Sequence, residues 1–538
     1  MPSRSERVGG GAGVAPAVEE RNAYLVGGGI ASLASAAYLI RDAGLAGRQI
    51  HVFEELDALG GSLDGEGTPQ SGYVIRGGRM FTDEAYTCTN DLLSFIPSLQ
   101  NPGESVRDEM RAFNARVRSH SRSRLVRAGE KVDVSTFGLS NQDRLDLLQL
   151  MTQSEESLGT KRIEDHFQPS FFTTNFWYMT FAFQPWHSVA ECRRYVLRFI
   201  QEVPRFATLG GVKRTPYNQY DAIVLPLTTW LKQQGVQFRV NCQVTGLDFQ
   251  RGASGKRVER LRYSDGDSES TAALAEGDVV FVTNGSMTAA SSLGSMTSPP
   301  RVDPKEVNRS SRLWKSIAAG NSDFGKPEVF FGNVDESKWL SFTATLHDPT
   351  FFALMEAFTG NVAGTGGLVT LIDSNWLMSV VLPHQPHFLN QPAGVNVFWG
   401  YGLFPEAQGN YVDKPMSECT GAEILVELWR LLRFDDHLHG MLESANCIPC
   451  MMPFITSQFM PRARGDRPLV RPTGTTNLAF IGQYCEIPDD VVFTVEYSVR
   501  SAQTAVYSLF GVDKRVSPLY KGQHDVGVLL NAMKTMLQ

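Results

Sequence analysis

The 538-residue sequence lacks any apolar run of the about 18 residues that a membrane-spanning helix needs. Its first 20 residues contain no apolar segment like that of a secretory signal, and their composition predicts a flexible tail. The formal net charge of -7 argues against nucleic-acid binding. Seven cysteines are too few for a disulfide framework and indicate a reducing compartment. We therefore expect a cytoplasmic protein with no nucleic-acid partner.

The sequence also gives little support for a redox-active thiol pair or a metal site. Cys447 and Cys450 have the spacing of a redox motif, but no thioredoxin-like pattern surrounds them. His384 and His387 lack the cysteine or carboxylate pattern that would complete a metal site. We expect no metal, and we expect His187 to be structural.

The most informative pattern that is present is a glycine turn close to the N-terminus. The apolar run from Ala23 to Val26 predicts a buried parallel strand, and small residues on one side of 30–40 predict a helix packed closely on a sheet. Between them, Gly27 allows a tight turn and Gly29 lets the backbone approach a pyrophosphate. Ser32, at the third glycine position of G-x-G-x-x-G, is small enough for close packing. The helix N-terminus would offer free N–H groups to a dinucleotide.

An acid at the end of the next strand supports the same interpretation. Residues 48–53 predict the second strand, and Glu54 follows it, where an acid accepts from ribose hydroxyls. The pair Gly60-Gly61 with Ser62, and a late strand ending at Gly482 before a helix, are common in large flavoproteins. We therefore expect FAD rather than NAD.

The expected fold is α/β: a discontinuous Rossmann-like FAD-binding domain, an inserted substrate-binding domain and a C-terminal helical part. A helix and then one strand are expected over 221–246, a strand over 278–283, another from 477 and a helix over 494–510. The expected parts are a tail at 1–21, FAD-binding segments at 22–135, 211–310 and 461–512, substrate-domain segments at 136–210 and 311–460, and a C-terminal segment at 513–538.

An arginine-rich stretch, residues 107–134, alternates in character and predicts a hairpin with Ala128 and Gly129 at its turn. Two interpretations stay open for it. It is either a solvated face or a basic surface for an anionic lipid or a fatty carboxylate.

Several longer motifs resemble the oleate hydratases, also called myosin-cross-reactive antigens. They occur in order along the chain, which makes the resemblance far more specific than a glycine turn. The motifs are GGSLDGEGTPQSGYVIRGGRMFTDEAYTCTNDLLSFIPS (60–98), FFTTNFWYMTFAFQPWHSVAECRRYVLRFI (171–200), TPYNQYDAIVLPL (215–227), FVTNGSM (281–287) and FTVEYSVRSA (493–502).

The resemblance implies an FAD-dependent hydro-lyase that adds water to the cis-9 double bond of oleate and gives 10-hydroxystearate. The flavin would undergo no net redox change, and it would work best reduced, as FADH2. Two other functions stay open: an FAD-dependent lipid oxidoreductase, such as a desaturase or an amine-oxidase-like enzyme, and a lipid binder without activity on the same scaffold. The mass of the product separates hydration from desaturation.

The resemblance also assigns catalytic residues. Tyr195 would give the proton to the alkene, and because the pKa of a free tyrosine is about 10, it keeps that proton at neutral pH. The family's water-activating glutamate is replaced by Met80, whose thioether is no base. Asp83 and Glu84 lie close by in a loop one residue longer than usual, so one of them, or loop carbonyls, would position the water.

Further contacts follow from the resemblance. Gln219 would lie near the head of an unsaturated, oleate-like fatty acid. Trp177 belongs to a run of eight aromatic residues between Phe171 and Trp186, which forms either an acyl tunnel or ordinary core. The cofactor contacts that the resemblance implies are Ala31, Glu54, Gly61, Ser62, Arg79, Val244, Ser286, Thr494 and Ser498.

Assembly and membrane contact are predicted from the two ends of the chain. The aromatic-rich N-terminal arm of many family members is replaced here by the Gly/Ala-rich tail, so we expect a monomer or a weak homodimer. Near the C-terminus, an apolar stripe either touches a membrane peripherally or packs on the protein. Its residues are Val528, Leu529, Leu530, Met533 and Met536.

Overall fold

The computed structural model describes residues 21–180, 182–253, 255–266 and 268–537. The predicted flexible tail therefore lies outside the described residues, except for Arg21. No helix within these ranges is both long enough and apolar enough to cross a membrane.

A five-stranded parallel sheet forms the centre of the nucleotide-binding region, with β1 in its middle. β1 pairs with β11 on one side and with β2 on the other, so Ala23 lies opposite both Val279 and Ile50. The predicted α/β class with a parallel sheet is confirmed. The strand order is β18 (Leu478–Ile481), β11 (Val279–Thr283), β1 (Ala23–Val26), β2 (Ile50–Phe53) and β7 (Gln237–Arg239).

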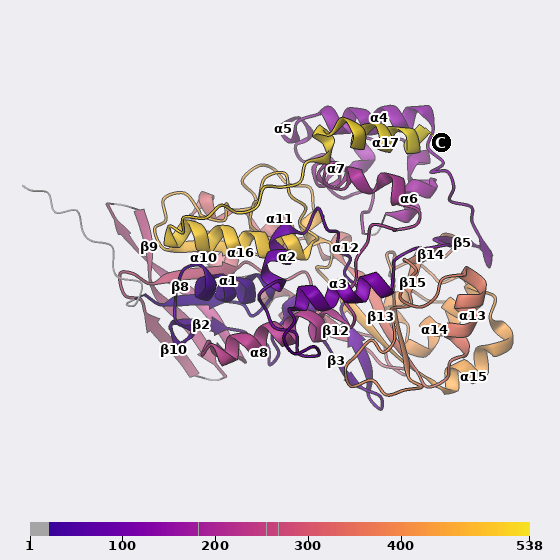
Figure 1. The fold of residues 1–538 in the computed structure, drawn as a ribbon, viewed down its shortest axis with the longest axis horizontal. Helices are drawn as coiled ribbons and strands as arrows, with labels where there is room; N and C mark the ends of the chain where they lie inside the picture. The colour runs from indigo at the N-terminus through magenta and orange to yellow at the C-terminus, as the bar shows by residue number, and fades with distance from the viewer. Residues whose placement is uncertain (1–20, 181, 254, 267, 538) are drawn as a thin grey trace, which may run out of the picture.

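Two long helices, α1 and α16, pack against each other beside this sheet (Figure 1). α1 (Ile30–Arg41) begins directly after the glycine turn, and its small residues Ala31, Ala34 and Ala37 are buried, as predicted. α16 (Val495–Phe510) matches the predicted helix closely. Other helices of this region are α2 (Thr87–Leu93), α3 (Val106–Arg116), α8 (Leu225–Gln233), α9 (Pro304–Arg309), α10 (Arg312–Ala318), α11 (Pro327–Phe331) and α12 (Val334–Ser337).

An eight-stranded sheet and three helices enclose a second hydrophobic core, on the right of Figure 1. The helices are α13 (Thr350–Thr359), α14 (Gly421–Leu431) and α15 (Leu438–Glu443). The strand order is β12 (Ser292–Leu293), β17 (Ala445–Met452), β13 (Trp339–Leu346), β16 (Asn396–Gly402), β15 (Met378–Val381), β14 (Val369–Leu371), β5 (Leu125–Arg127) and β6 (Glu130–Lys131). Smaller sheets contain β3 (Gly65–Thr68) and β4 (Gly72–Ile75), and β8 (Cys242–Gly252), β9 (Gly255–Asp265) and β10 (Ser268–Ala273).

A group of helices lies at the top of Figure 1 and includes the C-terminal helix; its member α6 contacts β5 of the eight-stranded sheet. α17 packs against the 3-10 turn Ile200–Arg205 that follows α7. The group consists of α4 (Asn141–Thr152), α5 (Glu155–Leu158), α6 (Asn175–Met179), α7 (Val189–Arg198) and α17 (Val526–Leu537).

Two local predictions need correction. The hairpin predicted over 107–134 is confirmed only at its turn, because residues 106–116 form α3, whose first turn is capped by Ser105. The single strand predicted within 221–246 is two strands, β7 and β8. They are separated at Asn241, whose φ of +53° breaks the extended backbone. The expected domain bounds stay a prediction.

His187, Cys447 and Cys450 are all buried. His187 is buried, and its Nδ1 accepts a hydrogen bond from the Gln184 N–H at 2.9 Å. Cys447 and Cys450 are buried free thiols. Within the described ranges, no three His, Cys, Asp or Glu side chains group as metal ligands.

The neutral state of His187 predicts part of the stability profile. Burial lowers the pKa of His187 to about 3, whereas the unfolded chain takes up a proton near pH 6.5. As pH falls below about 6.5, the unfolded state therefore binds more protons, and the free energy of unfolding falls by up to about 1.4 kcal/mol per pH unit. In His187→Gln we expect a smaller fall of Tm between about pH 7 and about pH 5. His439→Gln, at an exposed histidine, should keep the wild-type fall; an equal change in both variants would contradict the assignment.

Candidate active site

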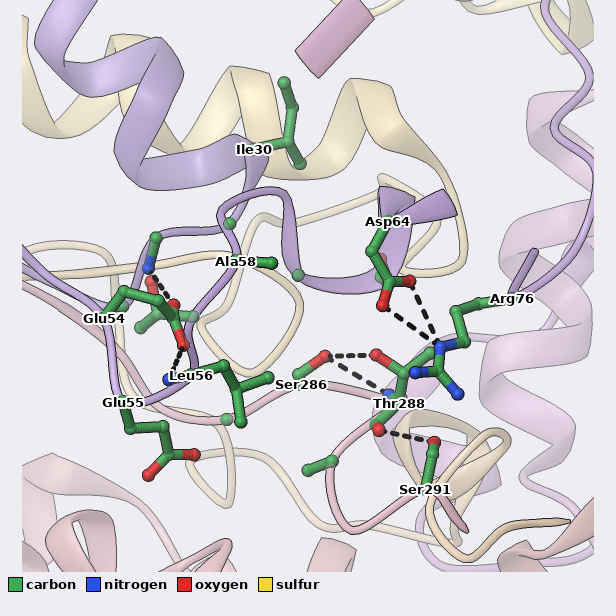
Figure 2. A pocket seen from close by; sticks show the side chains of 18 of the residues that line it. Ile30, Glu54, Glu55, Leu56, Ala58, Asp64, Arg76, Ser286, Thr288 and Ser291 are labelled. Atoms are coloured by element: carbon green, nitrogen blue, oxygen red, sulfur yellow. Dashed lines mark hydrogen bonds and ion pairs between the residues drawn. The ribbon is translucent and has the colours of Figure 1, made fainter. Parts of the chain in front are cut away.

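A cavity of about 810 Å³ opens where the strands of the parallel sheet end. Ligands of open α/β sheets bind at this edge, outside the carboxyl ends of the strands. Figure 2 shows Glu54 on one side of the cavity and the pair Asp64 and Arg76 on the other. The residues of the wall that follow strands β1, β2, β11 and β18 are Gly27, Glu54, Asn284 and Gly482.

The glycine turn leaves room for a ligand at the start of α1. Gly27 has a φ of +94°, and a Cβ there would lie 3.1 Å from the Cβ of Thr283. Gly29 precedes α1 and provides no side-chain cap, so the first N–H groups of the helix stay available. A Cβ on Gly29 would approach nothing closer than the Gly61 Cα, 3.9 Å away. This open space beside a helix N-terminus fits a pyrophosphate.

Glu54 fastens the glycine turn to the end of β2. Its Oε2 accepts from the Gly28 N–H at 2.5 Å, and its Oε1 accepts from the Leu56 N–H at 2.9 Å. Burial raises the pKa of Glu54, while these two hydrogen bonds oppose that shift. Each carboxylate oxygen can accept a further hydrogen bond, so the residue still fits the predicted contact with a ribose hydroxyl.

Most of the predicted cofactor residues meet in this wall, although they come from distant parts of the chain. Arg79 and Thr494 lie beside it instead. Arg79 donates to the Ser62 carbonyl at 2.9 Å, and Thr494 caps α16, its hydroxyl accepting from the Tyr497 N–H at 3.2 Å. The further predicted residues that line the cavity are Ala31, Gly61, Ser62, Val244, Ser286 and Ser498.

Three polar residues of the wall had no predicted role. Arg76 Nε lies 3.1 and 3.2 Å from the two carboxylate oxygens of Asp64, and Arg76 also donates to the Cys450 Sγ at 3.0 Å. Asn284 is 3% exposed, yet neither polar atom of its side chain has a hydrogen-bond partner among the described residues. Because buried amides are nearly always paired, this wall fits a polar ligand such as a dinucleotide. The sequence signals for Asn284 are its place at a strand end and within the motif FVTNGSM.

Tyr195 is held by the segment that leads into α16. Its hydroxyl accepts a hydrogen bond from the Phe493 N–H at 3.1 Å, and α16 continues from there to Ser498 in the cavity wall. Burial raises the pKa of Tyr195 well above its usual value, whereas the Phe493 N–H acts in the opposite direction. The phenol is therefore protonated at neutral pH, and a donor already faces its oxygen.

Aromatic rings surround this phenol. Phe183 meets the Tyr195 ring edge-on with 5.0 Å between ring centroids, and Phe459 does so at 5.8 Å. Tyr195 itself keeps part of its side chain accessible. These rings suit an apolar substrate, because they present apolar surface beside the hydroxyl.

The residues predicted to handle water lie in the loop between β4 and α2. Met80 is partly buried, as is its neighbour Arg79. Asp83 is exposed, and its Oδ2 forms an ion pair with the Lys213 Nζ at 3.6 Å. Glu84 is also exposed. Neither carboxylate is enclosed by the protein.

The predicted substrate residues are both buried. Gln219 is 6% exposed, and its Nε2 donates one long hydrogen bond of 3.4 Å to the Thr215 hydroxyl. Trp177 lies in α6 and packs edge-on against Phe172 at 4.8 Å. The contacts of Trp177 are those of an aromatic core.

Comparisons with known proteins show the family of this chain. The model of the MCRA family matches residues 20–507. An oleate hydratase of Streptococcus pyogenes serotype M49 is 40% identical over 532 residues, covering 96% of this chain and 89% of that protein. A linoleate hydratase of Lactiplantibacillus plantarum is 34% identical over 562 residues, covering 96% and 98%.

Among solved structures, the cyclohexylamine oxidase of Brevibacterium oxydans IH-35A has a TM-score of 0.51. It is 12% identical and is covered over 99% of its length by 91% of this chain. At this identity, the likeness concerns the fold alone.

The space beside Gly29 predicts a variant that folds but does not bind a dinucleotide. In Gly29→Ala the new methyl group has room within the protein, but it occupies the place where a pyrophosphate would approach. We expect a Tm close to that of the wild type and a loss of at least about tenfold in FAD affinity, measured by flavin absorbance and fluorescence titration. Gly440→Ala, at a glycine with open space around it, should bind like the wild type. If Gly29→Ala binds FAD as tightly as the wild type, the pyrophosphate does not lie beside Gly29.

Proposed function

Because the chain belongs to the MCRA family, we propose that it is a fatty acid hydratase that adds water to the cis-9 double bond of oleate and releases 10-hydroxystearate. The names of two relatives, an oleate hydratase and a linoleate hydratase, support this chemistry. Within this chain, the observation that carries the proposal is the hydrogen bond from the Phe493 N–H to the Tyr195 hydroxyl.

We assign FAD to the cavity at the sheet edge. The glycine turn and the N-terminus of α1 would hold its pyrophosphate, and Glu54 would hold its ribose. Asn284 would gain the hydrogen-bond partner that its buried amide lacks within the described structure. Bound FAD, in its reduced form FADH2, supplies an electron-rich ring that polarises the site without net redox change.

Tyr195 is the proton donor in this proposal. Its hydroxyl gives a proton to one alkene carbon, the oxygen of a water molecule bonds to the other, and a proton from that water restores the phenol. One water molecule is added, and no electrons are gained or lost. As the phenolate forms, the Phe493 N–H stabilises its oxygen, which is the kind of preorganised electrostatic effect that contributes most to many enzymes.

Positioning of the water is assigned to the loop that follows β4. Met80 provides no base, so it contributes apolar surface only. Asp83 and Glu84 are exposed, which favours the carbonyls of this loop over either carboxylate. The carbonyls accept hydrogen bonds from water and direct its lone pair.

Substrate and membrane contacts complete the proposal. Gln219 would contact the carboxylate end of the fatty acid, since its buried amide has one weak partner among the described residues. Trp177 would shape the aromatic side of the acyl site. We assign the enzyme to the cytoplasm as a monomer or weak homodimer that touches membranes peripherally. The residues of α17 with the most exposed apolar surface are Val526, Leu530, Met533 and Leu537.

Replacement of the proton donor gives the first test. In Tyr195→Phe we expect the hydration rate to fall by about 10²–10⁴-fold, because the general acid is lost while the ring remains. The assay follows oleate with FAD and a reductant by mass spectrometry, and wild-type product should gain the mass of one water. Tyr411→Phe, at an exposed tyrosine, should be unaffected. A product lacking two hydrogens would indicate a desaturase instead, and wild-type rates in Tyr195→Phe would refute the assignment.

The exposed acids give the second test. We expect Asp83→Asn and Glu84→Gln to keep hydration rates within about twofold of the wild type, because neither carboxylate is enclosed at the site. Steady-state rates with oleate measure this. If either variant loses about tenfold or more in kcat, that carboxylate, and not a loop carbonyl, activates the water.

A further inference from the structure

Buried charges behind Tyr195 join α7 to the segment 487–493 that leads into α16. Asp490 is completely buried, and its Oδ1 lies 3.1 Å from the Arg198 Nε. Its Oδ2 lies 3.3 Å from the Arg500 Nε. The carboxylate therefore connects a helix on each side, since Arg198 lies on α7 and Arg500 on α16.

Hydrogen bonds also hold the backbone of segment 487–493 in place. Asp490 Oδ1 also accepts from the N–H of the next residue, Val491, at 2.9 Å. From α7, Arg194 Nη1 donates to the carbonyls of Ile487 and Asp490, each at 3.3 Å. The position of segment 487–493 relative to α7 is thus determined by arginines on both sides of Tyr195 in the sequence.

Phe493 lies two residues after Val491, and its N–H is the donor to the Tyr195 hydroxyl. We propose that Asp490 is a positioning residue for the hydration: together with Arg198 and Arg500, it holds segment 487–493 so that the Phe493 N–H faces the phenol oxygen. This inference rests on the proposed role of Tyr195. It adds a completely buried residue that acts only through the acid.

The carboxylate charge is central to the arrangement. Arg198 and Arg500 are each 4% exposed, and buried guanidinium groups need a counter-charge. Asp490 supplies it to both arginines, and Arg500 also pairs with Glu496 at 2.8 Å. In Asp490→Asn, the amide keeps the shape and the Oδ1 acceptor. Its Nδ2, however, would place a donor against the Arg500 guanidinium, so segment 487–493 should move or loosen.

The control should lose an equally buried carboxylate elsewhere. Glu427 on α14 is completely buried and accepts from the N–H groups of Asn410, Tyr411 and Val412 at 2.5 to 2.9 Å. It lies on α14, whose buried apolar side chains belong to the second core, and among the described residues it makes no hydrogen bond or ion pair with the network around Tyr195. Glu427→Gln therefore reports the general effect of removing a buried charge.

The first measurement needs no activity. Hydrogen exchange followed by mass spectrometry compares peptides covering 487–493 in FAD-loaded wild type, Asp490→Asn and Glu427→Gln. We expect these peptides to exchange at least about fivefold faster in Asp490→Asn and at the wild-type rate in Glu427→Gln.

The second measurement separates binding from chemistry. We expect Asp490→Asn to lower kcat for oleate hydration by about tenfold with KM within about twofold, because only the orientation of the acid changes. In a Tyr195→Phe background the same substitution should lower the residual rate no further, since Asp490 acts through that phenol. If Asp490→Asn does not fold, Arg198→Lys retains the buried charge but breaks the same link and should give the same pattern.

The outcomes are distinct. A kcat within about twofold of the wild type in a folded variant, or equal changes in Asp490→Asn and Glu427→Gln, overturns the inference. The peptides covering 487–493 could exchange faster in Asp490→Asn while the wild type makes no hydroxy acid. That result overturns the proposed function but supports the positioning of the phenol by Asp490.

Discussion

The hydrogen bond from the Phe493 N–H to the Tyr195 hydroxyl is the interaction on which the account depends. A phenol is a weak acid, and burial among aromatic rings weakens it further, as the raised pKa of Tyr195 shows. The amide works against this effect, because it stabilises negative charge on the oxygen as the proton leaves. Tyr195 thus holds its proton at neutral pH and meets a fixed donor when it gives the proton up.

The same helix links this acid to the proposed flavin site. α16 begins at Val495, two residues after Phe493, passes Ser498 in the cavity wall, and packs along α1, which begins at the glycine turn. A shift of α1 or α16 would therefore change the geometry of both the acid and the proposed flavin site. This arrangement explains why segments far apart in the sequence must fold together before either site is complete.

Local patterns predicted much of this structure. The turn at Gly27 and the helix after it followed from glycine and small-residue spacing, and the strand ends followed from apolar runs. α3 was missed because arginines concealed an apolar face, Val106, Met110 and Phe113, at helical spacing. The hydrogen bond between Phe493 and Tyr195 could not be predicted from local patterns, because it joins residues 298 positions apart in the sequence.

The acidity of the phenol at position 195 is the most direct test of the central claim. Tyr195 can be replaced by fluorinated tyrosines of stepwise lower pKa, with oleate hydration measured at a pH where each phenol keeps its proton. If Tyr195 donates the proton in the rate-limiting step, kcat should change systematically with the acidity of the phenol. A kcat that does not depend on that acidity, in variants that still bind FAD and oleate, would contradict the account.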